Sequence, residues 1–204
     1  MNLGDIMKNN KITRKITQGM YILTTTNGGC VVDAVSQVSA GDQPLIAVSV
    51  MKKNYTNELM HNNDTFALSV LGMDVNPEII KTFGFNSMRD INKFEGLDLT
   101  EVNGVNIIND SLGYMVCEKL DTIENDTHTL FIGRLIEADV FKEGEPMSYG
   151  YYQEHKEELL KVKTESGQTA WVCTICGYVY YGEELPADFK CPTCGVPAHL
   201  FKKQ

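Results

Sequence analysis

The sequence predicts a mainly β protein with short helices, followed by a small cysteine-rich domain at its C-terminal end. Short runs rich in Val, Ile, Thr and Tyr recur through residues 1–152, and Gly, Asn, Asp or Pro bound them, as is typical of β-strands. Two longer alternating runs are neighbours in the chain. Four of the six cysteines lie within residues 173–194, and in a reducing compartment such crowding favours a metal site over disulfides.

Composition and charge narrow the classes of function. Hydrophobic residues make up 43% of the chain and charged residues 22%, which suits a soluble globular protein. The net charge of -9 and the pI near 4.9 argue against nucleic acid as the main partner. Residues 168–204 are neutral overall, so the negative charge belongs to the first part. No apolar run approaches the roughly 18 residues of a membrane span, and residues 1–10 lack a signal segment, so we expect a cytoplasmic protein without membrane association.

The expected strands follow in order along the first part. Residues 21–26, 45–51 and 65–71 are apolar or alternating. The longer runs at 112–121 and 127–141 are separated by a polar turn at 122–126. Such runs predict neighbouring antiparallel strands, long enough to curl into a barrel.

Helix signals lie between these strands. Asn76 and Pro77 predict a helix start, with Asn as the N-cap, and Gly84 predicts its end. A second helix is expected from near Asn54 to about His61. Residues 152–163 become highly charged and lead into a polar stretch at 164–168. We therefore divide the chain into a domain at 1–152, a linker at 153–169 and a domain at 170–204.

The C-terminal cysteines have the spacing of a metal site. Cys173 and Cys176 form one C-x2-C pair, and Cys191 and Cys194 form a second pair, with fourteen residues between the two pairs. Two such pairs can complete a tetrahedron of thiolates around one ion. Spacing alone leaves zinc and iron equally open.

The residues around the cysteines resemble the rubredoxin-like domain at the end of rubrerythrins. The matching positions are Trp171, Gly177, Tyr178, Gly182, Pro186, Pro192, Gly195 and Phe201. The resemblance implies one iron ion held by Cys173, Cys176, Cys191 and Cys194, which carries single electrons. The alternative is a zinc site that only supports the fold.

Polar clusters in the first domain are candidates for cofactor binding. Residues 24–30 read Thr-Thr-Thr-Asn-Gly-Gly-Cys, residues 36–39 read Ser-Gln-Val-Ser, and residues 53–56 read Lys-Asn-Tyr-Thr. Hydroxyl, amide and backbone N–H groups suit the edges and phosphate of a cofactor. Taken singly, each cluster is better explained as an ordinary loop or helix cap.

In sequence order, however, the clusters resemble the flavin reductase-like family, whose fold is an FMN-binding split β-barrel. Residues 82–87, Asp90, Lys93, Phe94, 128–133 and 146–152 extend the match to about residues 15–152. The resemblance implies FMN contacts from Asn27, Gly28, Cys30, Ser36, Gln37, Val38, Ser39, Lys53, Asn54 and Thr56. It places Phe85 and Ser87 near the nicotinamide side. Met88 stands where the family pattern has Gly.

For individual side chains, a purely structural role is the alternative to cofactor contact. Cys30 is a candidate flavin contact or a small buried hydrophobe, whereas Cys117 on an alternating strand is assigned to the core. His128 is a candidate contact for flavin or nucleotide, with a structural role as the alternative. No catalytic side chain is predicted, because flavin and iron supply the redox chemistry.

The order of the two domains resembles the family of high-molecular-weight rubredoxins. This resemblance implies a homodimer that passes electrons from NAD(P)H through FMN to iron, and onward to a flavodiiron protein that reduces O2 or NO. A carrier of FMN and iron fed by a separate reductase is a second hypothesis, and NADH would then leave its spectrum unchanged. A zinc-ribbon binding module on a flavin-free barrel is a third, and it would be colourless. The sequence does not distinguish NADH from NADPH.

Overall fold

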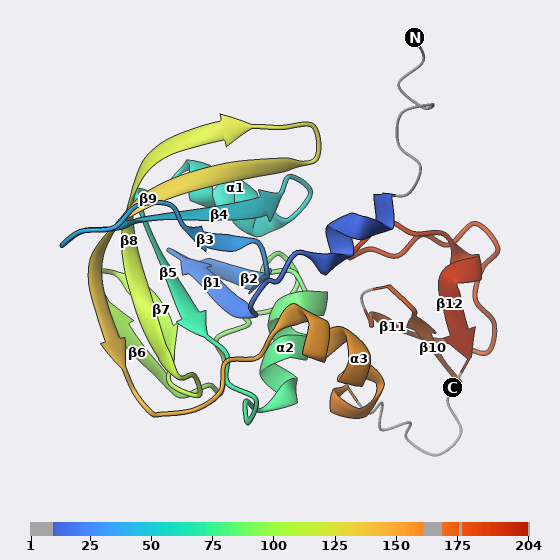
Figure 1. The fold of residues 1–204 in the computed structure, drawn as a ribbon. Helices are drawn as coiled ribbons and strands as arrows, with labels where there is room; N and C mark the ends of the chain where they lie inside the picture. The colour runs from blue at the N-terminus through green and yellow to red at the C-terminus, as the bar shows by residue number, and fades with distance from the viewer. Residues whose placement is uncertain (1–9, 161–168, 176, 204) are drawn as a thin grey trace, which may run out of the picture.

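The computed structural model of the 204-residue chain describes residues 10–160, 169–175 and 177–203. Figure 1 shows a large lobe of strands and helices beside a small lobe formed by the C-terminal strands. The strands of the large lobe are β1 Tyr21–Thr25, β2 Gly28–Val32, β3 Val35–Gln37, β4 Leu45–Met51, β5 Thr65–Val70, β6 Leu99–Val102, β7 Val105–Ile108, β8 Gly113–Glu124 and β9 His128–Val140. Its helices are η2 Asn10–Lys15, α1 Tyr55–His61, α2 Pro77–Phe85 and α3 Tyr149–Leu159. The small lobe contains β10 Ala170–Cys173, β11 Val179–Tyr181, η3 Ala198–Leu200 and β12 Phe201–Lys203.

Seven strands of the large lobe form one antiparallel sheet in the order β2-β1-β5-β8-β9-β4-β3. The long β8–β9 hairpin has register shifts at Val116/Cys117 and at Lys119/Asp121. Such irregularities bend a strand and increase its twist, and the sheet curls until β2 and β4 approach each other. The predicted mainly β class and the barrel-like curl are confirmed.

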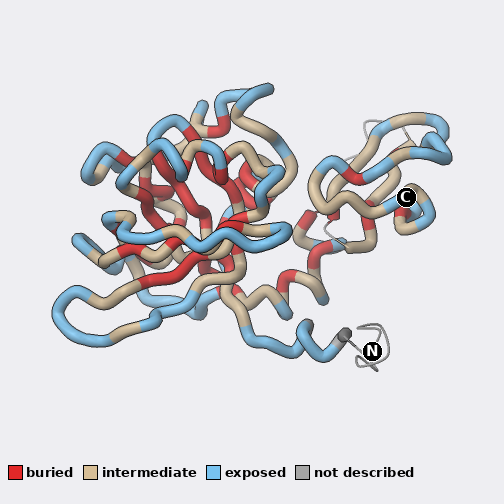
Figure 2. The backbone as a smooth tube through the Cα atoms, turned by 90° about the horizontal axis from the view of Figure 1, so that it is seen from above, coloured by how far each residue is buried: buried red, intermediate tan, exposed pale blue. Residues whose placement is uncertain are grey.

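Alternation along the strands divides the core into two parts. On β1, Leu23 packs inside the curl with Phe66 and Phe131, and all three are fully buried. Its neighbour Ile22 points to the other face and packs with Ile80 of α2, as the period of two along a strand requires. Figure 2 shows that buried residues concentrate inside the large lobe.

The predicted strands agree closely with the structure. The strand at 45–51 is confirmed in full, and those at 21–26 and 65–71 each end one residue earlier than predicted. The polar turn is shorter than expected because residues 122–124 continue β8. The two long strands pair antiparallel as predicted.

The predicted starts of α1 and α2 are confirmed, but the predicted end of α2 at Gly84 is wrong. Asn54 and Asn76 are the N-caps. Helix α2 continues through Gly84 and ends at Phe85, with Asn86 as its C-cap. A glycine inside a helix costs roughly 1 kcal/mol, but Phe83 on this turn is 1% exposed, and burying a phenylalanine gains more than that cost.

Helix α3 occupies the beginning of the segment expected to be a linker. Its Tyr152 is buried, and so is Leu160, which caps the helix. Both residues join the core cluster that contains α2. The rest of the expected linker, residues 161–168, lies outside the described residues. Among the described helices, none has the length and apolar character needed to cross a membrane.

Candidate functional site

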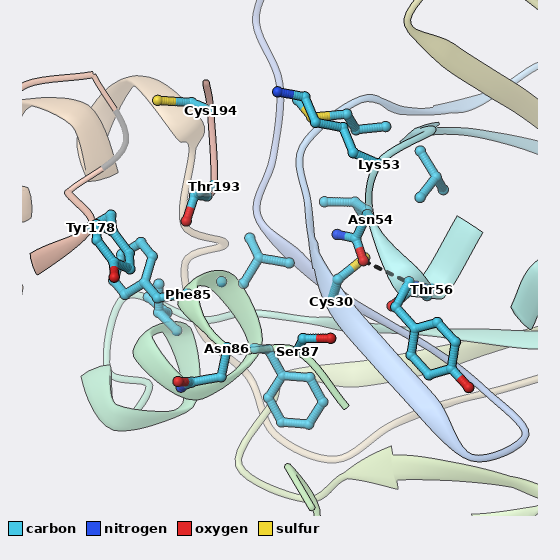
Figure 3. Close-up of a pocket in the computed structure, with 18 of the residues that line it drawn as sticks. Cys30, Lys53, Asn54, Thr56, Phe85, Asn86, Ser87, Tyr178, Thr193 and Cys194 are labelled. Carbon is cyan, nitrogen blue, oxygen red and sulfur yellow. Dashed lines mark hydrogen bonds between the residues drawn. The ribbon is translucent and has the colours of Figure 1, made fainter. Parts of the chain in front are cut away.

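A cavity of about 670 Å³ lies where the two lobes meet. Seven of the predicted site residues line it from the large lobe, namely Cys30, Lys53, Asn54, Thr56, Phe85, Ser87 and His128. From the small lobe come Ile175, Tyr178, Pro192, Thr193 and Cys194. Figure 3 shows Cys194, Thr193 and Tyr178 on one side of the cavity, with Lys53, Asn54 and Thr56 on the other.

The start of α1 supplies the polar side of the cavity. The side chain of Asn54 accepts a hydrogen bond of 3.0 Å from the backbone N–H of Thr56, which positions both residues at the cavity wall. Lys52 forms an ion pair with Glu124 at 2.7 Å. Lys53 lines the cavity and has no ion pair within the described part of the chain, so its ammonium group can receive an anion.

Cys30 presents a neutral thiol to the cavity. It lies on β2 and is 1% exposed. Burial raises the pKa of its thiol, and hydrogen bonds from the side chains of Thr56 and Asn54 and the charge of Lys93 offset this only in part. Because the thiolate is disfavoured, Cys30 contributes a small polarizable contact.

The end of α2 and the segment that follows it form a third wall of the cavity. Phe85 meets Tyr178 of the small lobe edge to face, with ring centroids 6.5 Å apart. Ser87 accepts a hydrogen bond of 3.1 Å from the backbone N–H of Arg89. Arg89 in turn lies over the ring of Tyr55, 4.2 Å from its centroid, and pairs with Glu58 of α1. These contacts fix the segment against α1.

His128 and Asp33 lie near each other at the β4–β9 end of the cavity. Nδ1 of His128 lies 2.8 Å from the hydroxyl of Thr127. Burial raises the pKa of Asp33, and its own backbone hydrogen bonds and the charge of His128 partly oppose this. Asp33 was not among the predicted site residues.

The other predicted contacts do not line this cavity. Asn27 is exposed in the β1–β2 turn with a φ of 61°, and Gly28 is buried against Leu59 of α1. Ser36 and Gln37 lie on β3 at the edge of the sheet, and Val38 and Ser39 follow. Within a single chain, the structure does not bring these six residues to the cavity.

Lys93 is a site residue that sequence reasoning missed. It is 3% exposed, and its Nζ donates to the carbonyl oxygens of Gly29 at 2.9 Å and Phe83 at 3.1 Å. Burial lowers the pKa of Lys93, and the nearby Cys30 opposes this. A lysine is ordinarily expected at the surface, so only the fold shows that this amine joins β2 to α2 at the cavity wall.

Three of the four predicted metal ligands meet in the small lobe. The sulfur atoms of Cys173, Cys191 and Cys194 all lie within 4.8 Å of one another. Cys176 lies outside the described residues. Thiolates about 2.3 Å from one tetrahedral ion lie roughly 3.8 Å apart, and the Sγ atoms of Cys173 and Cys194 are 3.7 Å apart. The geometry therefore fits a metal ion.

The two cysteine loops have matching backbone geometry. Gly177 and Gly195 have φ angles of 87° and 75°, a conformation that favours glycine. Their N–H groups donate to the carbonyl oxygens of Cys173 and Cys191, at 2.9 and 2.8 Å. Glycine at these two positions therefore lets each loop turn, and the two hydrogen bonds run to carbonyl oxygens and not to sulfur.

Aromatic rings form a large part of the small core around the cysteines. Phe189 packs against Phe201 and Tyr180, with ring centroids 5.4 and 4.9 Å away. Trp171 donates from its indole nitrogen to the carbonyl of Gly182 at 3.1 Å. Cys173, Cys191 and Cys194 belong to the same cluster, so the cysteine loops are part of this core.

Family comparisons agree with this two-lobed architecture. The family described as flavin reductase like domain matches residues 13–160. The family described as rubrerythrin, rubredoxin-like domain matches residues 171–202. The chain therefore belongs to the flavin reductase-like family and carries a rubredoxin-like domain at its C-terminal end.

Individual relatives refine the class. A high molecular weight rubredoxin from Moorella thermoacetica is 33% identical, covering 95% of this chain and 98% of that protein. A ferric-chelate reductase (NAD(P)H) from Archaeoglobus fulgidus is 31% identical, covering 68% of this chain and 85% of that protein. An NADH:FAD oxidoreductase from Streptomyces globisporus shares the fold, with a TM-score of 0.62 and 21% identity over 68% of this chain and 84% of that one. The chain is thus an oxidoreductase of the flavin- and iron-linked electron-transfer class.

Proposed function

We propose that this protein passes electrons from NAD(P)H through FMN to one iron ion held by four cysteines, and then to a redox protein. The observation that carries the proposal is the shared cavity. Cys194, a predicted iron ligand, lines the same cavity as Cys30, Lys53 and Thr56, which are predicted flavin contacts. Short-range electron transfer needs such an arrangement.

The cavity suits a flavin in size and in chemistry. Its volume of about 670 Å³ lies in the usual range for small-molecule sites. Lys53, Asn54 and Thr56 would hold the phosphate, and the side chains of Cys30 and Phe85 would contact the ring system. Gln153 also lines the cavity, and its buried Nε2 has no hydrogen-bond partner among the residues that the structure describes. A buried donor of this kind fits a ligand acceptor.

Cys173, Cys176, Cys191 and Cys194 would hold the iron. When both groups are bound, FMN accepts a hydride and iron accepts single electrons, so oxidation of one NAD(P)H yields NAD(P)⁺, one proton and two ferrous centres. The protein's own part is to hold both sites in one cavity. The names of two relatives, an NAD(P)H reductase and an NADH oxidoreductase, support a nicotinamide donor.

A homodimer and a separate redox partner are part of the same proposal. Apolar side chains of Val38, Leu120, Ile123, Ile136 and Val140 are exposed on β8, β9 and after β3. A second subunit on this surface would bury them and would cover the edge that carries Ser36 and Gln37. The flavodiiron acceptor is proposed from the resemblance, and the division at residues 152 and 170 is proposed from the charged and polar stretch between the two parts.

The visible spectrum of anaerobically purified protein tests the function. We expect flavin and ferric-thiolate absorbance that bleaches on addition of NADH, with FMN and iron present in equal amounts. Two chromophores that do not respond would indicate a carrier fed by another reductase. Zinc without flavin would refute the proposal.

A variant separates the two halves of the pathway. Cys191→Ala should abolish electron delivery to the acceptor while leaving flavin reduction by NADH at its normal rate. Full delivery by this variant would contradict a route through iron. The flavodiiron acceptor is tested by the rate at which it reoxidises the reduced protein.

A further inference from the structure

A buried lysine joins the large lobe to the first cysteine loop. Lys156 of α3 is 8% exposed. Its Nζ donates to the carbonyl oxygens of Thr174 at 2.7 Å and Ile175 at 3.0 Å, and to Oε1 of Gln153 at 3.1 Å. An ammonium group has three N–H donors, so these three acceptors match its capacity. Burying a charged group is costly unless it is well hydrogen-bonded, so these contacts between the two lobes indicate a specific role for Lys156.

Apolar packing surrounds this polar contact. A Cβ atom placed on Gly177 would lie 2.8 Å from Leu160 Cδ1 and 3.5 Å from the hydroxyl of Tyr152. The loop therefore packs directly on α3 and on Leu160 behind it. Beside it, Tyr178 contacts Phe85 at the end of α2. The first cysteine loop is thus seated on the large lobe by apolar, aromatic and charged contacts together.

The second cysteine loop approaches the start of α1. A Cβ atom on Gly195 would lie 2.6 Å from Nζ of Lys53. Figure 3 shows the side chain of Lys53 extending toward the loop that carries Thr193 and Cys194. Both cysteine loops therefore face the cavity wall that belongs to the same chain.

We propose that Lys156 is a positioning residue that holds the iron-binding domain over the flavin cavity of its own chain, and that its charge favours the reduced iron centre. This inference rests on the proposed function. Four thiolates give the site a formal charge of -1 with ferric iron and -2 with ferrous iron, as the ligand charges dictate. Lys156 binds carbonyl oxygens within two residues of Cys173. A fixed cation there stabilises the more negative state.

Three variants separate position from charge. Lys156→Met removes the charge and the donors at similar side-chain length, whereas Lys156→Arg keeps the charge and some of the donors. Lys202→Met is the control, because Lys202 is exposed on β12 of the small lobe and its removal changes the net charge equally. Each variant is made in the full chain and loaded with its metal. Should Lys156→Met fail to fold, Lys156→Gln gives the same measurements.

Hydrogen exchange measures the docking. In Lys156→Met, backbone amides around Thr174 and Phe85 should lose at least about tenfold in protection, because a hydrogen bond from a charged donor contributes roughly that factor. Lys156→Arg should recover part of the protection, and Lys202→Met should match the wild type. Unchanged protection in Lys156→Met would overturn the positioning role.

Reductive titration of the iron absorbance measures the effect of the charge. The midpoint potential should become more negative in Lys156→Met and return toward the wild-type value in Lys156→Arg. An equal potential in all variants would refute the electrostatic role. If the site holds zinc, the proposed function and the electrostatic role both fail, while hydrogen exchange still decides whether Lys156 fixes the domain.

A hybrid dimer tests whether docking occurs within one chain. One subunit carries Lys156→Met with an intact iron site, and its partner carries Cys191→Ala with Lys156 intact. Docking within one chain predicts the shifted potential of Lys156→Met, whereas docking across subunits predicts the wild-type potential. A protein that proves monomeric by light scattering would dock within its own chain by necessity.

Discussion

Two buried thiols in the large lobe are held in their neutral form. Burial raises the pKa of Cys30 on β2, and it raises the pKa of Cys117 on β8 to about 12. Cys117 is fully buried among the side chains inside the sheet. A thiol in this state neither binds a metal nor attacks an electrophile. Cys173 and Cys191 are buried as well, so among the described cysteines it is the clustering of sulfur atoms, and not burial, that distinguishes the metal ligands from Cys30 and Cys117.

The pKa of Cys117 predicts a loss of stability at alkaline pH. The unfolded thiol loses its proton above the ordinary value of 9.0, whereas the folded thiol keeps it up to about 12. The stabilising contribution is therefore complete below pH 9 and disappears as the pH rises through this window. Between pH 8 and pH 10 the wild type should lose about 1.4 kcal/mol more free energy of unfolding than Cys117→Val.

Urea denaturation of both proteins at the two pH values measures this difference. Because the valine variant keeps Cys30 and the metal site, their pH dependence cancels in the comparison. Equal pH dependence in the two proteins would show that Cys117 is accessible or already ionised in the folded state.

At the scale of elements, α1 and α2 both begin with an asparagine N-cap, but only the N-cap of α1 lies at the cavity. Asn54 caps α1 by accepting from Thr56 N, and Asn76 caps α2 by accepting from Glu78 N at 3.1 Å. Asn54 lines the cavity, whereas Asn76 is exposed. Variants of these two N-caps can therefore separate an effect on stability from an effect on flavin binding.

Replacing either cap by alanine should lower the free energy of unfolding by about 1 kcal/mol. Only Asn54→Ala should also weaken flavin binding, because only that side chain borders the cavity. Urea denaturation measures the first effect, and titration of flavin fluorescence measures the second. Equal flavin affinity in the two variants would remove Asn54 from the proposed site.

At the scale of the whole molecule, the small lobe depends on its metal. Domains below about 40 residues rarely bury enough apolar surface to fold alone, and the matched rubredoxin-like region spans only residues 171–202. In the described part of this lobe, the core cluster has three buried residues, Cys173, Cys191 and Phe201, with partly buried side chains around them. Metal binding and folding of this lobe should therefore be coupled.

Metal removal should unfold the small lobe and leave the large lobe folded. Trp171 is the single tryptophan of the chain and lies in the small lobe, so its fluorescence reports on that lobe alone. On chelation its emission should shift to longer wavelength, while the circular dichroism of the large sheet is retained. Metal-free Cys191→Ala should show the same emission without chelator. An unshifted spectrum in both cases would mean that the lobe folds without metal.

The sequence alone predicted the features that depend on local order. The cysteine spacing, the start of α1 near Asn54 and the cap Asn76 are all set by residues close in the chain. Strand patterns were also predictable, because a buried face imposes alternation on each strand. Gly84 was mispredicted because packing of the adjacent Phe83 outweighs local helix propensity.

Only the tertiary structure decided what depends on distant contacts. It buried Lys93 between β2 and α2, and it placed Lys156 against the first cysteine loop. It also left Ser36 to Ser39 away from the cavity of their own chain. No local pattern encodes these outcomes, because the burial of a charge and the meeting of two lobes depend on surfaces formed by residues far apart in the sequence.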